Sequence, residues 1–149
     1  MAGIVAIAST EGEVALAAAT AKTVVRVTAA TNHPVKILGW GIYFDGISAS
    51  AQPVQVRARK STTAGTSTAV TIRKINATAG TIQTTSGKNF TAEGTDSDIL
   101  DIVEVHPSSG YEVKYPVGQE PVITGGERFG LKVTAPAVVN CEAKIIFEE

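Results

Sequence analysis

Residues 121–136 read PVITGGERFGLKVTAP, and residues 138–149 read VVNCEAKIIFEE. In both segments apolar side chains alternate with small, polar or charged ones. Side chains on a strand point alternately to opposite faces of a sheet, so each segment predicts a half-buried strand. The apolar rows consist of Phe129, Leu131 and Val133 in the first segment and Cys141, Ala143, Ile145 and Phe147 in the second. Ile146 is an exception, because it places an apolar side chain on the otherwise charged face of the last strand.

Two short connections complete this C-terminal unit. Gly125 and Gly126 predict a hairpin turn, because glycine readily adopts the positive φ angles that such a turn needs. Residues 135–137 then join the last two strands. We therefore expect a C-terminal β-hairpin whose last strand runs to the end of the sequence.

Residues 35–45 form the most apolar stretch upstream of this unit, and they also alternate. One predicted face carries Leu38, Trp40, Ile42 and Phe44, and the other carries Ile37, Gly39, Gly41 and Tyr43. Glycine inside a strand often marks a bulge or the close approach of another backbone. We therefore expect a neighbouring chain segment to lie close to this strand.

Further short strands separated by turns are predicted in residues 3–10, 22–29, 53–60, 69–75, 99–105 and 111–115. Residues 15–21 fit a short helix or a strand, of which we favour the strand, and residues 81–90 fit an edge strand or an ordered loop. Residues 1–12 also fit an extended N-terminal arm. About eight to ten short antiparallel strands without a long helix predict an all-β fold, a jelly-roll β-sandwich.

Composition limits the class of protein. At 149 residues the chain has room for one domain, spanning residues 1–149. A net charge of −1 argues against a nucleic-acid partner, which usually meets a basic stripe. The single cysteine, Cys141, excludes an internal disulfide framework and fits a small core residue. No apolar stretch approaches the length of a membrane span, so we expect a soluble protein made in a cytoplasm.

No pattern of catalytic or metal-binding residues stands out. His33 and His106 each precede a proline in a turn and have no ligand-type neighbours at metal-site spacing. The acidic cluster of Asp96, Asp98 and Asp101 lacks the spacing of a calcium-binding hand loop. The sequence also lacks a Gly-x-Ser-x-Gly nucleophile elbow. We therefore expect no enzyme activity, no metal and no cofactor.

Several segments resemble small proteins encoded in the structural gene clusters of tailed phages. They are GIYFDGISASAQPVQV at residues 41–56, TTAGTSTA at 62–69, EVHPSSG at 104–110, GGERFGLKVTAPAVVN at 125–140 and FEE at 147–149. Together they cover most of residues 38–149, whereas the first 35 residues contribute little. The resemblance implies a capsid decoration (cement) protein. Such proteins are often jelly rolls that bind the outside of an icosahedral head as trimers and bridge neighbouring major capsid protein subunits.

That role brings no catalytic residues, so the candidate site consists of subunit or capsid contacts. Aromatic anchors commonly dominate protein interfaces. The candidate contacts are Trp40, Tyr43, Tyr111, Tyr115 and Ile146. For the aromatic residues, the alternative is that they fill the core of their own subunit. Basic residues at Arg57, Arg59, Lys60, Arg73 and Lys74 fit either a solvated sheet face or a weak contact with an acidic protein surface.

Two other functions fit the same fold. One is a β-sandwich carbohydrate- or receptor-binding module of a phage fibre. The other is a small hydrolase on a sandwich fold. The decoration protein is the preferred hypothesis, because the resemblance supports it and no catalytic pattern supports the hydrolase.

Overall fold

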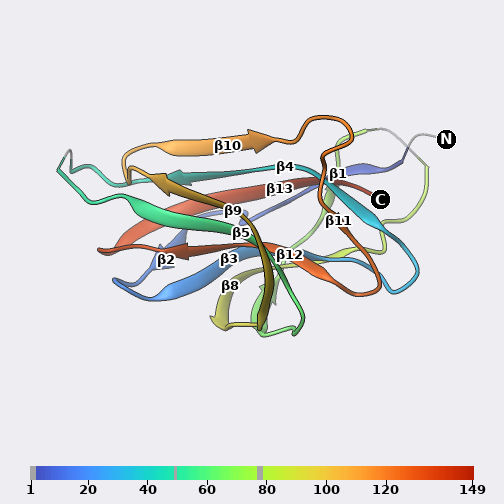
Figure 1. Cartoon of the computed structure of the whole chain (residues 1–149), viewed down its shortest axis with the longest axis horizontal. Helices are drawn as coiled ribbons and strands as arrows, with labels where there is room; N and C mark the ends of the chain where they lie inside the picture. Colours follow the sequence, from blue (N-terminus) through green and yellow to red (C-terminus); the bar gives the residue numbers. More distant parts are fainter. Residues whose placement is uncertain (1–2, 49, 77–78) are drawn as a thin grey trace.

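The structure, a computed structural model, is a sandwich of two antiparallel β-sheets and is described for residues 3–48, 50–76 and 79–149 (Figure 1). The seven-stranded sheet contains β1 (Val5–Ser9), β2 (Val14–Leu16), β4 (Val35–Phe44), β7 (Arg73–Lys74), β10 (Gly110–Lys114), β11 (Val122–Ile123) and β13 (Val139–Glu148). The six-stranded sheet contains β3 (Ala21–Thr28), β5 (Val54–Ser61), β6 (Thr66–Ala69), β8 (Thr85–Ala92), β9 (Asp96–Val105) and β12 (Arg128–Thr134). Within these ranges, no helix is long and apolar enough to cross a membrane.

The strand order defines the edges of both sheets. The first sheet runs β10-β4-β13-β1-β7, with β11 added to β4 and β2 added to β13. The second runs β6-β8-β3-β12-β5-β9. The all-β sandwich predicted from the sequence is confirmed, although short strands such as β7 and β11 raise the number above the expected eight to ten. The jelly-roll topology stays a prediction.

The alternation in the C-terminal segments is confirmed, but the predicted hairpin is wrong. Every apolar side chain of the two predicted rows is buried. However, β12 belongs to the six-stranded sheet and β13 to the seven-stranded sheet, so the two strands do not pair with each other. Gly125 and Gly126 do have positive φ angles, 59° and 83°, but they join β11 in one sheet to β12 in the other. Alternation identifies which face is buried without identifying the neighbouring strand.

A bulge changes the predicted faces of β4. The register with β13 shifts so that Phe147 pairs with Ile37 while Ile146 pairs with Gly39. Leu38 is the extra residue, and a residue inserted in this way reverses the alternation beyond it. Ile37 is therefore buried together with Trp40, whereas Leu38 is only partly buried. The expectation that Leu38 and Trp40 share a face was wrong for this reason.

The N-terminal segment lies inside the seven-stranded sheet. β1 pairs with β13 on one side and with β7 on the other, so residues 5–9 form a strand here and not a free arm. Met1 and Ala2 lie outside the described residues. For residues 15–21, the strand interpretation is confirmed only at the two ends, Ala15 and Leu16 in β2 and Ala21 in β3, because residues 17–20 lie between β2 and β3. Of residues 81–90, the first four precede the strand, and the rest belong to β8, which lies between β3 and β6 and is therefore not an edge strand.

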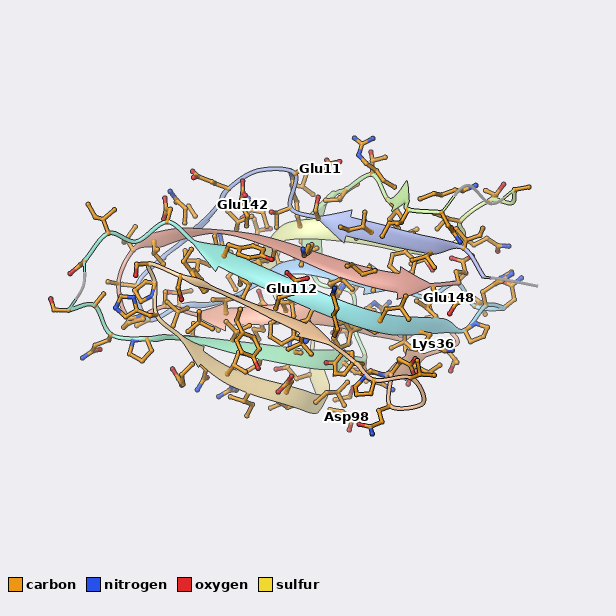
Figure 2. The ribbon with its side chains drawn as sticks, turned by 90° about the horizontal axis from the view of Figure 1, so that it is seen from above. Glu11, Lys36, Asp98, Glu112, Glu142 and Glu148 are labelled. Atoms are coloured by element: carbon orange, nitrogen blue, oxygen red, sulfur yellow. The ribbon has the colours of Figure 1, made fainter. Side chains whose placement is uncertain are left out.

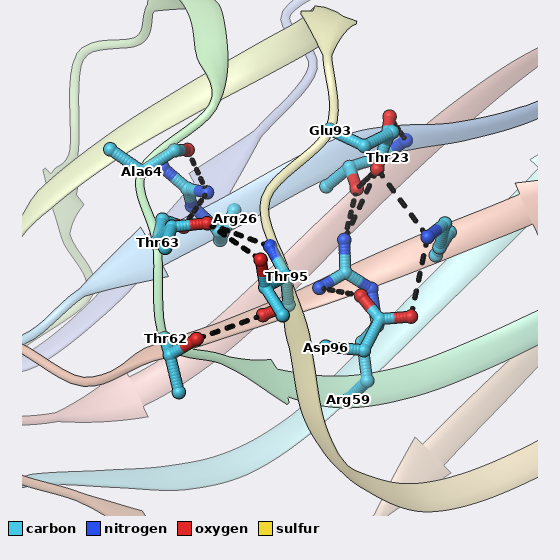
Figure 3. Close-up of polar contacts among 10 residues, drawn as sticks. Thr23, Arg26, Arg59, Thr62, Thr63, Ala64, Glu93, Thr95 and Asp96 are labelled. Carbon is cyan, nitrogen blue, oxygen red and sulfur yellow. Dashed lines mark hydrogen bonds and ion pairs between the residues drawn. The ribbon is translucent and has the colours of Figure 1, made fainter.

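The connection from β8 to β9 crosses the outer face of the six-stranded sheet, because β3, β12 and β5 lie between these two strands. Its carboxylates meet Arg59, whose side chain is only 1% exposed (Figure 3). Arg59 Nη1 lies 2.6 Å from Asp96 Oδ1, and Nη2 lies 3.2 Å from Glu93 Oε2. Nη2 also donates a hydrogen bond of 2.6 Å to the Thr23 hydroxyl, which in turn donates to Glu93. This network fastens the crossing segment to the sheet.

A second loop packs against the same segment. The Thr95 backbone N–H donates to the Thr63 hydroxyl at 2.7 Å, and Gly94 lies so close to Thr63 that a Cβ atom would collide with its carbonyl oxygen. Arg26 donates to the Ala64 carbonyl (Figure 3). Its guanidinium also lies 4.4 Å from the centre of the Phe90 ring. Burial, with Arg128 and Arg59 nearby, lowers the pKa of Arg26 to about 10, so the side chain still carries its charge at neutral pH.

We predict that Arg59→Met lowers the free energy of unfolding by about 3 kcal/mol, because Glu93 and Asp96 lose their buried cation. Lys36→Met is the control. Lys36 faces Glu148 at 3.9 Å with its side chain 45% exposed, and loss of such a surface pair costs at most about 1 kcal/mol. Urea unfolding of both variants measures the difference. Equal losses in the two variants would contradict a central role for Arg59.

Candidate interaction surfaces

Three of the predicted contact residues, Trp40, Tyr111 and Tyr115, meet where β10 pairs with β4. The Trp40 and Tyr111 ring centres are 5.7 Å apart, and Trp40 Nε1 donates a hydrogen bond of 3.1 Å to the Tyr115 hydroxyl. Burial raises the pKa of Tyr115, which keeps its hydroxyl protonated. Trp40 is 1% exposed, so it fills the core of its own subunit and is not available for contacts. Tyr111 remains 41% exposed at the edge of this cluster.

The other two, Tyr43 and Ile146, lie on the outer face of the seven-stranded sheet, away from the core. Tyr43 is 41% exposed and donates a hydrogen bond of 2.6 Å to Glu112, which raises the pKa of the Tyr43 hydroxyl (Figure 2 labels Glu112). Lys144 Nζ lies 3.4 Å from the same Glu112 carboxylate and 5.6 Å from the centre of the Tyr43 ring. The three side chains lie over Gly41, where a Cβ atom would be 3.1 Å from Lys144 Cε.

Ile146 belongs to a row of residues that crosses four strands. It pairs with Gly39 of β4 on one side and with Ile7 of β1 on the other, and Ile7 pairs with Arg73 of β7. Ile146 and Ile7 are both partly buried. A Cβ atom at Gly39 would collide with the carbonyl oxygen of Val113, which confirms the close backbone approach expected for this strand. The row therefore has an apolar middle and a basic end.

One end of the sandwich carries an apolar surface that sequence reasoning missed. The β4–β5, β9–β10 and β12–β13 loops surround a hollow of about 550 Å³, which we name the loop-end hollow. Its lining includes Ile47, Ala51, Pro107, Pro136, Val138 and Val139. Ile47 is 100% exposed and Val138 is 77% exposed, although both side chains are aliphatic and their exposure to water is unfavourable. In the sequence, this surface was indicated only by an apolar residue within each of the three loops.

Short-range contacts hold these loops in place. Asn140 donates two hydrogen bonds of 2.9 Å to the Asp45 carboxylate, one from its backbone N–H and one from its side-chain amide. The Gly46 N–H donates to the Pro107 carbonyl at 2.7 Å, and a Cβ atom at Gly46 would collide with that oxygen. The loop-end hollow thus has an ordered base beneath its exposed aliphatic side chains.

The residues considered for chemistry lie apart. His33 contacts Asn32 and His106 contacts Ser108, each within its own turn. Asp96 is engaged by Arg59 and Lys132. Burial raises the pKa of Cys141 to about 12, so the thiol stays protonated, as expected for a core residue. Among residues 3–48, 50–76 and 79–149, no group of three or more His, Cys, Asp and Glu side chains is placed to hold a metal ion.

Comparisons with known proteins give no relative from which a role can be transferred. The chain matches no protein family, no curated protein and no solved structure. The function must therefore be argued from the surfaces of this molecule.

We predict that Tyr115→Phe lowers the free energy of unfolding by about 1–3 kcal/mol, because the buried indole N–H of Trp40 loses its acceptor. Tyr43→Phe is the matched control. Its hydroxyl bonds Glu112 on an exposed face, so its loss should change stability by less than about 0.5 kcal/mol. Denaturant unfolding followed by the fluorescence of Trp40, the one tryptophan in the chain, measures both. A larger loss for Tyr43→Phe would contradict this assignment.

Proposed function

We propose that this chain is a virion structural protein, a capsid decoration protein that binds the outer surface of a tailed-phage head as an oligomer and stabilises it. In this proposal the partners are sister subunits, in a trimer, and the major capsid protein. The protein is made in the host cytoplasm and ends on the virion surface. The observation that carries the proposal is the loop-end hollow, where Ile47 and Val138 are exposed above an ordered base.

Exposed apolar surface on a folded domain usually marks an interface. The loop-end hollow suits a protein partner because most of its lining residues are apolar, among them Ile47, Pro107 and Val138. A carbohydrate site would instead present aromatic rings to the sugar, and none of the described lining residues is aromatic. The geometry therefore favours capsid binding over the carbohydrate- or receptor-binding alternative.

The strand connections also support this class of protein. From β3 to β4, from β4 to β5, from β9 to β10 and from β12 to β13, the chain passes from one sheet to the other. Repeated crossing between two sheets is typical of jelly rolls, the fold that the resemblance implies. We include that topology in the proposal.

We predict that the double variant Ile47→Asp and Val138→Asp binds heads at least about tenfold more weakly than the wild-type protein, because charges replace the apolar contacts. The test uses heads of the phage whose genome encodes the chain, after removal of their own decoration protein. Co-sedimentation measures binding, and the disruption temperature of the heads measures stabilisation.

Val117→Asp is the matched control for this test. Val117 is 97% exposed but lies in the β10–β11 connection, outside the loop-end hollow. It should bind like the wild-type protein. Failure of the wild-type protein to bind these heads, or binding to immobilised glycans that the Asp variant loses, would overturn the proposed function.

A further inference from the structure

The β9 strand forms an unusually apolar sheet edge. It is ten residues long, and among the strands of residues 3–48, 50–76 and 79–149 it pairs with β5 alone, so none of these strands lies along its other side. Three large apolar side chains of this strand are exposed: Ile99 by 47%, Leu100 by 42% and Ile102 by 54%. A long edge of this kind can accept a strand from another chain.

This edge is also acidic. Residues 96–105 contain four acidic and no basic residues. Asp96 is neutralised by Arg59 and Lys132, and Glu104 accepts a hydrogen bond from Gln55. No basic side chain in the part of the chain that the structure describes forms an ion pair with Asp98 or Asp101. These two carboxylates add negative charge around the exposed apolar side chains.

The opposite side of the sandwich has the complementary charge. β7 is the last strand of its sheet, and within the described part of the chain it pairs with β1 alone. Residues 70–75 contain Arg73 and Lys74 and no acidic residue. The Arg73 side chain is 71% exposed, and Ile75, which directly follows this strand, is 55% exposed. Arg73 has one acidic neighbour, Glu11, at 3.5 Å.

The two edges point away from each other. In Figure 2, Glu11, the partner of Arg73, lies along one side of the sandwich, and Asp98 lies along the other. Each edge is therefore open to a second copy of the chain but not to the other edge of the same copy. Pairing of β9 with β9 would bring acidic residues together, whereas pairing of β9 with β7 brings opposite charges together.

We infer that the β9 edge of one copy binds the β7 edge of a second copy, with Asp98 and Asp101 facing Arg73 and Lys74 and with exposed isoleucines on both sides. Such a contact joins two different surfaces, so it is heterologous and closes into a ring when the rotation allows. The inference deepens the proposed function, because it rests on the proposed oligomer and names the surfaces that build it.

Charge reversal tests this contact. We predict that Asp98→Lys with Asp101→Lys weakens self-association at least about tenfold, and that Arg73→Glu with Lys74→Glu does the same, because each places like charges across the contact. The chain with all four substitutions regains assembly. A mixture of the two double variants forms complexes that contain both chains. Size-exclusion chromatography with light scattering measures the mass of every species.

Two controls accompany this experiment. Glu142→Lys reverses an exposed charge on β13, which β1 separates from β7, and leaves the assembly unchanged (Figure 2). Circular dichroism and the thermal midpoint establish that each variant is folded. Lys74 donates to the Gly80 carbonyl, so Arg73→Glu alone serves as a second variant that keeps this bond.

The possible results separate this inference from the proposed function. A monomeric wild-type chain, or an oligomer that is insensitive to all charge reversals, overturns the contact between β9 and β7 while head binding can still be observed. A charge-dependent oligomer that fails to bind heads supports the contact and overturns the proposed function.

Discussion

The fold depends on a cation held beneath a crossing segment. β8 and β9 lie on opposite sides of three other strands, so the chain between them must pass over the outer face of its own sheet. Without a cation beneath it, this segment would place its carboxylates against the face of the sheet with no partner of opposite charge. Arg59 resolves this by binding Glu93 and Asp96 at the two ends of the passage, while Thr23 fixes the orientation of Glu93. A buried ion pair adds little when both partners are replaced together, but loss of Arg59 alone would leave two carboxylates to share the single cation of Lys132.

This arrangement also explains why β9 is available as an edge. The strand starts at Asp96, directly after the point where the network holds the chain, and its pairing with β5 has two register shifts near Arg59. Bulges of this kind twist an edge and limit uncontrolled pairing with other chains. The acidic residues of the strand act in the same direction. The edge is therefore exposed yet selective, which suits a partner with the opposite charge.

Much of the fold could be predicted from the sequence, because alternation is a local property. The buried faces of β12 and β13 and the class of the fold follow from it. The choice of neighbouring strand could not be predicted, because β12 and β13 bury their apolar faces equally well in different sheets. The reversal of faces at Leu38 also depends on pairing with another strand. For the candidate site, Tyr43 and Tyr111 could be proposed from the sequence because aromatic residues are common at interfaces. Ile47 and Val138 could not, because their exposure depends on how three loops meet in space.

The position of β13 has a consequence for how the protein is made. β13 lies between β1 and β4, so the earliest described strand of this sheet and its longest upstream strand both pair with the most C-terminal of the described strands. The central part of the sheet cannot close until β13 has been synthesised, and apolar strands stay unpaired until then. Folds dominated by such distant pairings form slowly, on the order of milliseconds to seconds. Chaperones that shield unpaired strands would therefore be expected to raise the yield of this chain more than that of a protein whose strands pair in order.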